Sequence, residues 1–368
     1  MVHDYISEFG GAERVLKALT ELFPQAPIYT AFKIKGSTAA KEFSNKKIIE
    51  SKYAFLVKHG KLYSPLRFLA PKIWQSFDLQ GFDVIISSAS WYITKGFKVS
   101  KNALNICYCH TPPRYLYGYK TSLEWQRYWP IKLYATIINK YLRQYDFTSA
   151  QKVDFFLANS KNIQARISKF YRRDSEIVYP PVKLEEIKKA CKNLKPKDYY
   201  LLVSRVVGAK GISLALKTAN KLNIKLKIVG EPAGLRWQEK DFQKLKNKNI
   251  EFIGRVEDKK LWQLYGECKA FLALAEDEDF GITPVEAMAA GRPVIAFNGG
   301  GYQETVINGK TGIFFNKPEV ASLSQAIVNL KKMDIKRIDC QSQAKKFSEN
   351  RFKKEIKDFI LKKTASKF

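Results

Sequence analysis

The amino-acid sequence predicts an α/β protein made of two doubly wound, Rossmann-like domains that face each other across a cleft. The chain has 368 residues, which is long for a single hydrophobic core. Short apolar runs alternate with amphipathic stretches in both halves, as is typical of parallel sheets covered by helices. Pro180-Pro181 and the lysine-rich stretch to Lys197 separate the halves, because adjacent prolines break regular structure.

The first half is predicted to form one domain, at residues 1–183. Three apolar runs read as buried strands, at residues 84–86, 104–108 and 153–158. A helix is predicted at residues 12–22, directly after a pair of glycines. Apolar side chains recur at helical spacing near the end of the chain, at Phe352, Ile356, Phe359 and Ile360. We expect this last helix, from about residue 345 to 368, to complete the first domain.

The second half shows a more regular alternation and is predicted to form the other domain, at residues 184–344. Its predicted strands lie at residues 199–206, 226–229, 250–253, 271–275 and 294–297, and a helix is predicted at residues 212–222. Ligands of doubly wound sheets bind beyond the carboxyl ends of the strands. The residues that follow these strands are therefore the first candidates for a functional site.

The net charge of +29 admits three explanations, which are nucleic-acid binding, an anionic membrane surface and a general excess of lysine. Two stretches, at residues 51–76 and 115–145, interleave basic with aromatic side chains. The basic residues are Lys52, Lys58, Lys61, Arg67 and Lys72 in the first stretch and Lys120, Arg127, Lys132, Lys140 and Arg143 in the second, where Trp125 and Trp129 also lie. This mixture favours an anionic membrane surface, and no nucleic-acid partner is expected.

Cytoplasmic localisation, peripheral on the inner face of the membrane, is expected from three further features. No apolar run approaches the roughly 20 residues that span a bilayer. The N-terminus lacks the basic and then apolar pattern of a signal peptide. The five cysteines show no CxxC spacing, so the sequence indicates neither a zinc site nor a disulfide framework.

The most informative segment is residues 275–289, which follows a predicted strand and opens a helix. Glu278 and Glu286 offer carboxylates to sugar hydroxyls, and the Phe280-Gly281-Ile282 turn lets the backbone approach a ligand. A structural alternative exists for Glu286, since Thr283 and Glu286 have the spacing of a capping box with proline at the first helical position. The acidic residues 276–279 also fit a metal site or a solvated loop.

Two cations follow the predicted strand at residues 199–206. Arg205 offers a bidentate fork and Lys210 a point charge, and both stand between a strand and a helix. Preorganised cations at such a place stabilise negative charge that develops on a departing diphosphate. Either residue alone is equally compatible with a solvated cation in a lysine-rich protein.

Candidate residues also occur in the first half. His110 closes the predicted strand at residues 104–108 and precedes Thr111-Pro112, an X-Pro turn that fixes the backbone. Gly10 and Gly11 precede a helix whose first N–H groups suit an anion. A lone histidine is more often structural, and a glycine pair alone is weak support for a site.

Together these motifs resemble glycosyltransferase family 4, whose members have the GT-B fold and retain configuration. The pattern Glu-x-Phe-Gly-x-x-x-x-Glu is matched at Glu278, Phe280, Gly281 and Glu286. The resemblance implies that Glu278 contacts the donor sugar, that Glu286 contacts the ribose, and that Arg205 and Lys210 hold the diphosphate. It places His110 against the sugar and acceptor, and Gly10 and Gly11 beside the diphosphate. Relatives carry more apolar residues before His3, so the first strand is unusually short or the natural start lies upstream.

The resemblance implies a mannosyltransferase of lipopolysaccharide or surface-glycan assembly. The expected reaction transfers a hexose, mannose from GDP-mannose, to a lipid-linked or glycan acceptor at the membrane. Arg205 and Lys210 supply the charge that a metal would, so no metal cofactor is expected. Three alternatives stay open at this point, namely a different donor such as a UDP-hexose, a basic nucleic-acid-binding protein, and a binding module without catalysis.

Overall fold

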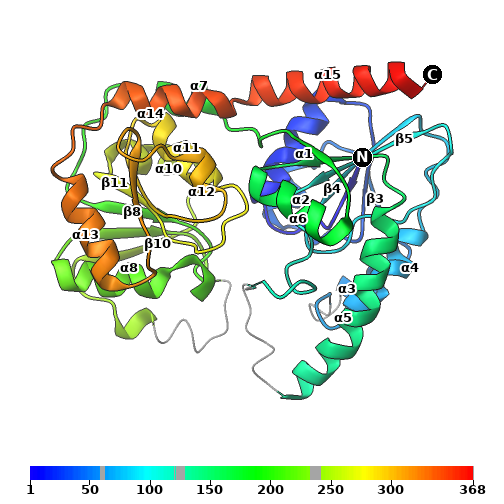
Figure 1. Cartoon of the computed structure of the whole chain (residues 1–368), viewed down its shortest axis with the longest axis horizontal. Helices are drawn as coiled ribbons and strands as arrows, with labels where there is room; N and C mark the ends of the chain where they lie inside the picture. Colours follow the sequence, from blue (N-terminus) through cyan, green and yellow to red (C-terminus); the bar gives the residue numbers. More distant parts are fainter. Residues whose placement is uncertain (59–62, 120, 122–128, 233–241, 368) are drawn as a thin grey trace. The chain divides into compact units, whose positions relative to one another are not determined.

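The computed structural model describes residues 1–58, 63–119, 121, 129–232 and 242–367. The chain forms two compact units (Figure 1). The first consists of Met1–Tyr119, Trp125–Pro181 and Asn350–Phe368, and the second is formed mainly by Val182–Glu349. Each unit contains one parallel sheet, with seven strands in the first and six in the second. The predicted architecture of two parallel α/β domains is therefore confirmed.

The first sheet has the strand order β3-β2-β1-β4-β5-β6-β7. Its strands are β1 (Val2–His3), β2 (Ile28–Thr30), β3 (Ile48–Glu50), β4 (Val84–Ala89), β5 (Leu104–Cys109), β6 (Phe155–Ala158) and β7 (Ser175–Ile177). The helices of this unit are α1 (Gly11–Leu22), α2 (Thr38–Glu42), α3 (Ala54–Lys58), α4 (Ala70–Gln75), α5 (Trp129–Ala150), α6 (Lys161–Tyr171) and α15 (Glu349–Lys367), with a 3₁₀ turn η2 (Arg67–Leu69). The strand order reverses between β1 and β4.

Alternate side chains of this sheet face two layers of helices. On one face Ile106 and Leu157 pack with apolar residues of α1 and α15, including Phe352 and Ile356. On the other face Cys107 and Phe156 pack with Ile163 and other residues of α6. This alternation follows from the two-residue period of a strand. The C-terminal helix thus contributes its apolar side to the core of the first unit.

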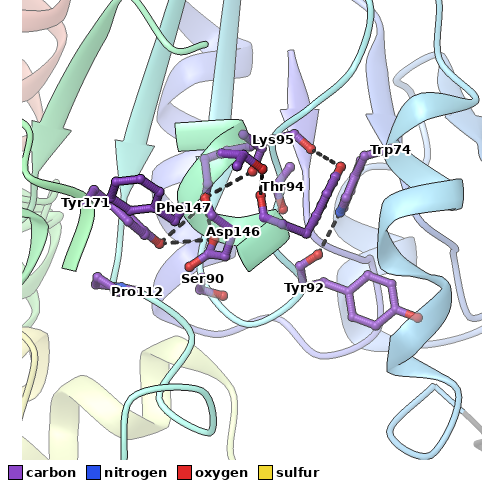
Figure 2. Close-up of polar contacts among 12 residues, drawn as sticks. Trp74, Ser90, Tyr92, Thr94, Lys95, Pro112, Asp146, Phe147 and Tyr171 are labelled. Atoms are coloured by element: carbon purple, nitrogen blue, oxygen red, sulfur yellow. Dashed lines mark hydrogen bonds and ion pairs between the residues drawn. The ribbon is translucent and has the colours of Figure 1, made fainter. Parts of the chain in front are cut away.

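A buried ion pair joins α5 to the loop that follows β4. Lys95 Nζ lies 2.8 Å from Asp146 Oδ1, and both side chains are inaccessible to solvent. Tyr171 contributes its hydroxyl to the same pair, as Figure 2 shows. Tyr117 donates a further hydrogen bond to Asp146 at 2.7 Å. Burial alone would lower the pKa of Lys95, but the charge and hydrogen bond of Asp146, together with the nearby Cys107 and Cys109, outweigh burial and hold that pKa above its usual value.

The second sheet has the strand order β10-β9-β8-β11-β12-β13. Its strands are β8 (Tyr200–Val203), β9 (Leu226–Val229), β10 (Ile250–Gly254), β11 (Ala270–Ala273), β12 (Val294–Phe297) and β13 (Gly312–Phe315). The helices are α7 (Leu184–Ala190), α8 (Ile212–Leu222), α10 (Asp258–Glu267), α11 (Ile282–Ala289), α12 (Tyr302–Thr305), α13 (Val320–Leu330) and α14 (Arg337–Ala344), with 3₁₀ turns η4 (Gly208–Lys210) and η5 (Lys345–Phe347). Helices α8 and α13 cover one face, and α10 and α11 lie on the other (Figure 1).

The order of the second sheet reverses between β8 and β11, which are hydrogen-bonded neighbours. At such a reversal the connecting helices leave in opposite directions, and a crevice opens beyond the carboxyl ends of the two strands. The loops after β8 and β11 carry the cations and carboxylates that the sequence singles out. Within the described part of the chain, no helix is both long and apolar enough to cross a bilayer.

Candidate active site

The loops after β8 and β11 bring Lys210 and Glu278 together. Lys210 lies in η4, directly after β8, and Glu278 follows β11. The Lys210 Nζ atom donates to Glu278 Oε2 at 2.7 Å, and both side chains are partly exposed to solvent. Tyr302, at the start of α12, donates its hydroxyl to the same oxygen at 3.2 Å. A cation and a carboxylate from opposite sides of the sheet reversal therefore share one position at its carboxyl edge.

A glycine turn shapes the loop that carries Glu278. Gly300 has a φ of +55°, and a Cβ atom at this residue would collide with the backbone oxygen of Glu278. The Gly301 N–H donates to that oxygen at 2.9 Å. Any side chain at Gly301 would meet the backbone of Phe280. Residues 299–301 are glycines because two backbone segments approach each other closely here.

The start of α11 differs from the capping-box alternative for Glu286. The helix begins at Ile282, with Gly281 as its N-cap at a φ of +92°, so Thr283 is not the N-cap. Glu286 is buried and accepts a hydrogen bond from the Tyr265 hydroxyl at 2.8 Å. The free N–H groups at the first turn of α11 point to the same edge of the sheet. Glu286 therefore lies under this edge, one turn into the helix.

Other predicted residues of the second unit lie around the Lys210–Glu278 pair without joining it. Phe280 is buried and packs edge-on against Phe347, with ring centres 5.3 Å apart. Arg205 follows β8 and is exposed. In the described residues, no hydrogen bond or ion pair links Arg205 to Glu278. Its guanidinium is thus available to solvent on the side of the sheet reversal where Lys210 lies.

In the first unit, His110 is part of a buried hydrogen-bond chain that the sequence did not reveal. His110 Nε2 lies 2.8 Å from Ser88 Oγ, and the same oxygen lies 3.0 Å from His3 Nδ1. The other ring nitrogen of His3 lies 3.3 Å from Glu13 Oε1. Glu13 also accepts from the Gly10 N–H at 2.9 Å. The chain connects β5, β4, β1 and the first turn of α1.

Burial and, to a smaller extent, the neighbouring His3 lower the pKa of His110 to about 4. His110 is therefore neutral near pH 7, so its ring contributes a hydrogen bond rather than a charge. Its backbone is held as well, since Asn159 donates to the His110 carbonyl at 2.9 Å. Histidine at position 3 ends strand β1, at the point where the order of the first sheet reverses. That position is the signal by which His3 could have been found.

Residues 184–347 match the family model of glycosyl transferases group 1. Together with the parallel sheet in each unit, this match defines the class of the chain as a glycosyltransferase with two α/β domains of the GT-B fold. The chain is 28% identical over 329 residues to the alpha-1,3/1,6-mannosyltransferase ALG2 of Dictyostelium discoideum. This alignment covers 74% of the chain and 75% of the relative.

Two further likenesses are informative. Over 78 residues the chain is 37% identical to the lipopolysaccharide core biosynthesis mannosyltransferase LpcC of Rhizobium leguminosarum bv. viciae, which covers 21% of this chain and 22% of that protein. The crystal structure of Anabaena Alr3699/HepE in complex with UDP-glucose superposes with a TM-score of 0.69 at 15% identity. That match covers 98% of this chain and 99% of the Anabaena chain, and it shows the shared fold.

Proposed function

We propose that this glycosyltransferase is a retaining enzyme that transfers mannose from GDP-mannose to a lipid-linked or glycan acceptor at a membrane surface. The observation that carries the proposal is the contact between Lys210 and Glu278 at the reversal of the second sheet. Relatives named as mannosyltransferases support mannose as the sugar. A UDP-hexose is the alternative donor, because a protein of the same fold binds UDP-glucose.

The proposed roles follow from the charges of the site. Arg205 and Lys210 hold the diphosphate, where negative charge grows as the bond to the sugar breaks. Glu278 accepts hydrogen bonds from the sugar hydroxyls. Before the donor binds, Lys210 and Glu278 compensate each other's charge. We propose that, when the donor binds, Lys210 pairs with the diphosphate and Glu278 pairs with the sugar hydroxyls.

We also propose roles for the other residues at the strand ends and helix starts. Backbone groups of Phe280, Gly281 and Ile282 line the donor site, and Glu286 binds the ribose. This role for Glu286 requires its carboxylate to share its hydrogen bonds between the ribose and Tyr265. The neutral ring of His110 orients the reacting groups, and Gly10 and Gly11 border the diphosphate. For the Gly10 N–H to bind an anion, it has to give up its hydrogen bond to Glu13.

A thermal-shift comparison of nucleotide-sugars tests the proposed donor. We expect GDP-mannose to raise the melting temperature more than UDP-glucose, UDP-galactose or free mannose. A donor at about 100 times its Kd stabilises the folded protein by about 2.7 kcal/mol. A larger shift with a UDP-hexose would establish the alternative donor. The absence of a shift with every nucleotide-sugar, for a folded protein, would refute a donor site.

We further propose that turnover needs no metal ion, because Arg205 and Lys210 supply positive charge to the diphosphate. The expected result is that EDTA leaves the rate of donor turnover unchanged within experimental error. The measurement compares initial rates of nucleotide release before and after chelation, and again after addition of Mg²⁺ or Mn²⁺. A large loss with EDTA that magnesium restores would contradict the proposal.

A further inference from the structure

Helix α5 carries a row of large apolar side chains on the surface of the first unit. Trp129, Leu133, Ile137 and Tyr141 follow one another at intervals of four residues, and each side chain is between 52% and 76% exposed. At about 100° per residue, such a row sweeps about 120° of the helix surface over its length. We call these four residues the α5 stripe. Contiguous exposed apolar side chains of this kind mark an interaction surface.

The α5 stripe lies opposite the side of the helix that packs on the protein. The buried residues of α5 include Ala135, Leu142 and Asp146, which belong to the other side of the helical wheel. Asp146 ties that side to Lys95 through the buried ion pair (Figure 2). Helix α5 thus packs on the protein with one side and carries exposed apolar residues on the opposite side. Only the packed side contributes to the core of the first unit.

The charges on α5 determine which partner fits the stripe. Its exposed charged residues are Lys132, Lys140 and Arg143, and its one acidic residue is the buried Asp146. An amphipathic helix with aromatic and aliphatic residues beside cations lies in the interface of a bilayer, where each nearby cation gains about 1 kcal/mol from anionic lipids. An uncharged or acidic apolar face would have suited a protein partner equally well.

Neighbouring segments extend the same surface. Arg67 of η2 donates to Asn139 of α5 at 3.3 Å and stacks over the ring of Tyr134 at 5.2 Å. This contact holds the turn η2 against α5, and Phe68 of the same turn is partly exposed. Residues 51–76 contain no acidic side chain. In the same stretch α3 exposes Phe55 and Leu56. Of the basic and aromatic residues that the sequence singled out, Lys61, Lys120, Trp125 and Arg127 lie outside the described residues.

We propose that the α5 stripe is a docking surface for a bilayer that contains anionic lipids, with Lys132, Lys140 and Arg143 facing the headgroups. The proposal rests on the proposed function, because it gives the lipid-linked acceptor a membrane surface next to the enzyme. It assigns the positive charge of the first unit to membrane attachment. The aromatic ends of the stripe, Trp129 and Tyr141, suit the polar boundary of the hydrocarbon layer.

Vesicle flotation tests the proposal with closely matched variants. The test variant is Leu133→Glu with Ile137→Glu, at side chains that are 57% and 63% exposed. The control is Leu361→Glu with Ile338→Glu, where exposure is 59% and 62% on α15 and α14. We expect the wild type and the control to float with phosphatidylglycerol-containing vesicles. The test variant should lose about tenfold or more of its vesicle binding, since carboxylates do not enter the interface.

Pure phosphatidylcholine vesicles serve as the second arm, and wild-type binding to them should be several times weaker. Donor-induced thermal shift is measured for every variant, so that a failure of the donor site and a failure of docking give different results. A test variant that keeps its thermal shift and loses flotation supports the docking surface. Equal flotation of test and control variants, no flotation of the wild type, or self-association through α5 in place of lipid binding would overturn it.

Discussion

Replacement of Lys210 by alanine is expected to lower kcat/KM for donor turnover by about 10²–10³-fold. Lys210 is the cation that the structure places directly beside Glu278, at the reversal of the second sheet. In the proposed reaction its charge counts most in the transition state, because that is when the diphosphate gains negative charge. Most of the loss should therefore appear in kcat. The variant should fold, since the side chain is partly exposed and contributes little to the core.

The measurement is steady-state kinetics of nucleotide release, with Lys217→Ala as the control. Lys217 lies one helix further along the chain, on α8, and is exposed. Its removal changes the net charge equally and should leave turnover within about twofold, because exposed charges far from the site are screened. Lys210→Arg should retain part of the activity by keeping the charge. Wild-type turnover in Lys210→Ala would refute the assignment of this lysine to the diphosphate.

The substitution Lys95→Met is expected to lower the free energy of unfolding of the first unit by about 3–5 kcal/mol. It leaves the Asp146 carboxylate buried without its counter-ion, 2.8 Å from where the ammonium was. The hydroxyls of Tyr117 and Tyr171 still donate to Asp146, but neutral donors do not replace the lost charge. A buried charge that loses its partner costs much more than an exposed one.

Urea titration measures this loss, and two further variants separate its causes. The double substitution Lys95→Met with Asp146→Leu removes both charges and should recover a large part of the stability. The exposed pair of Lys227 and Glu251 provides the comparison, because its removal by Lys227→Met should cost less than about 1 kcal/mol. If Lys95→Met and Lys227→Met were equally stable, the buried pair would not hold α5 in the way the structure indicates.

Several elements of the second unit could be predicted to the residue. The helix Ile212–Leu222 and the strands Leu226–Val229 and Val294–Phe297 have the bounds that the apolar pattern predicts. Each is a strong apolar or amphipathic run between glycine or polar residues, so local spacing determines it. The strand predicted at residues 199–206 is shorter, because pairing stops at Val203. The strands β2, β3 and β7 escaped prediction, since three residues give too little periodicity, and β13 escaped because its four residues begin with a glycine.

In the candidate site, the positions of residues at strand ends could be predicted, but their contacts could not. Glu278 and Lys210 could be assigned to the carboxyl edge of a sheet, because each follows a predicted strand. Their contact could not, since it depends on β8 lying beside β11 rather than beside the next strands along the chain. The alternative role of Glu286 in a capping box was decided only by the helix start at Ile282.

By itself, the sequence determined the α/β class, the strands and helices with strong patterns, and the residues that stand at strand ends. These properties depend on neighbours within about one helical turn or one strand, and such neighbours are visible in the order of residues. Only the tertiary structure decided that His110, Ser88 and His3 form one chain, that Lys95 meets Asp146, and that the α5 stripe faces solvent. Each of these joins or exposes residues through the strand order and the packing of whole layers, which no local spacing encodes.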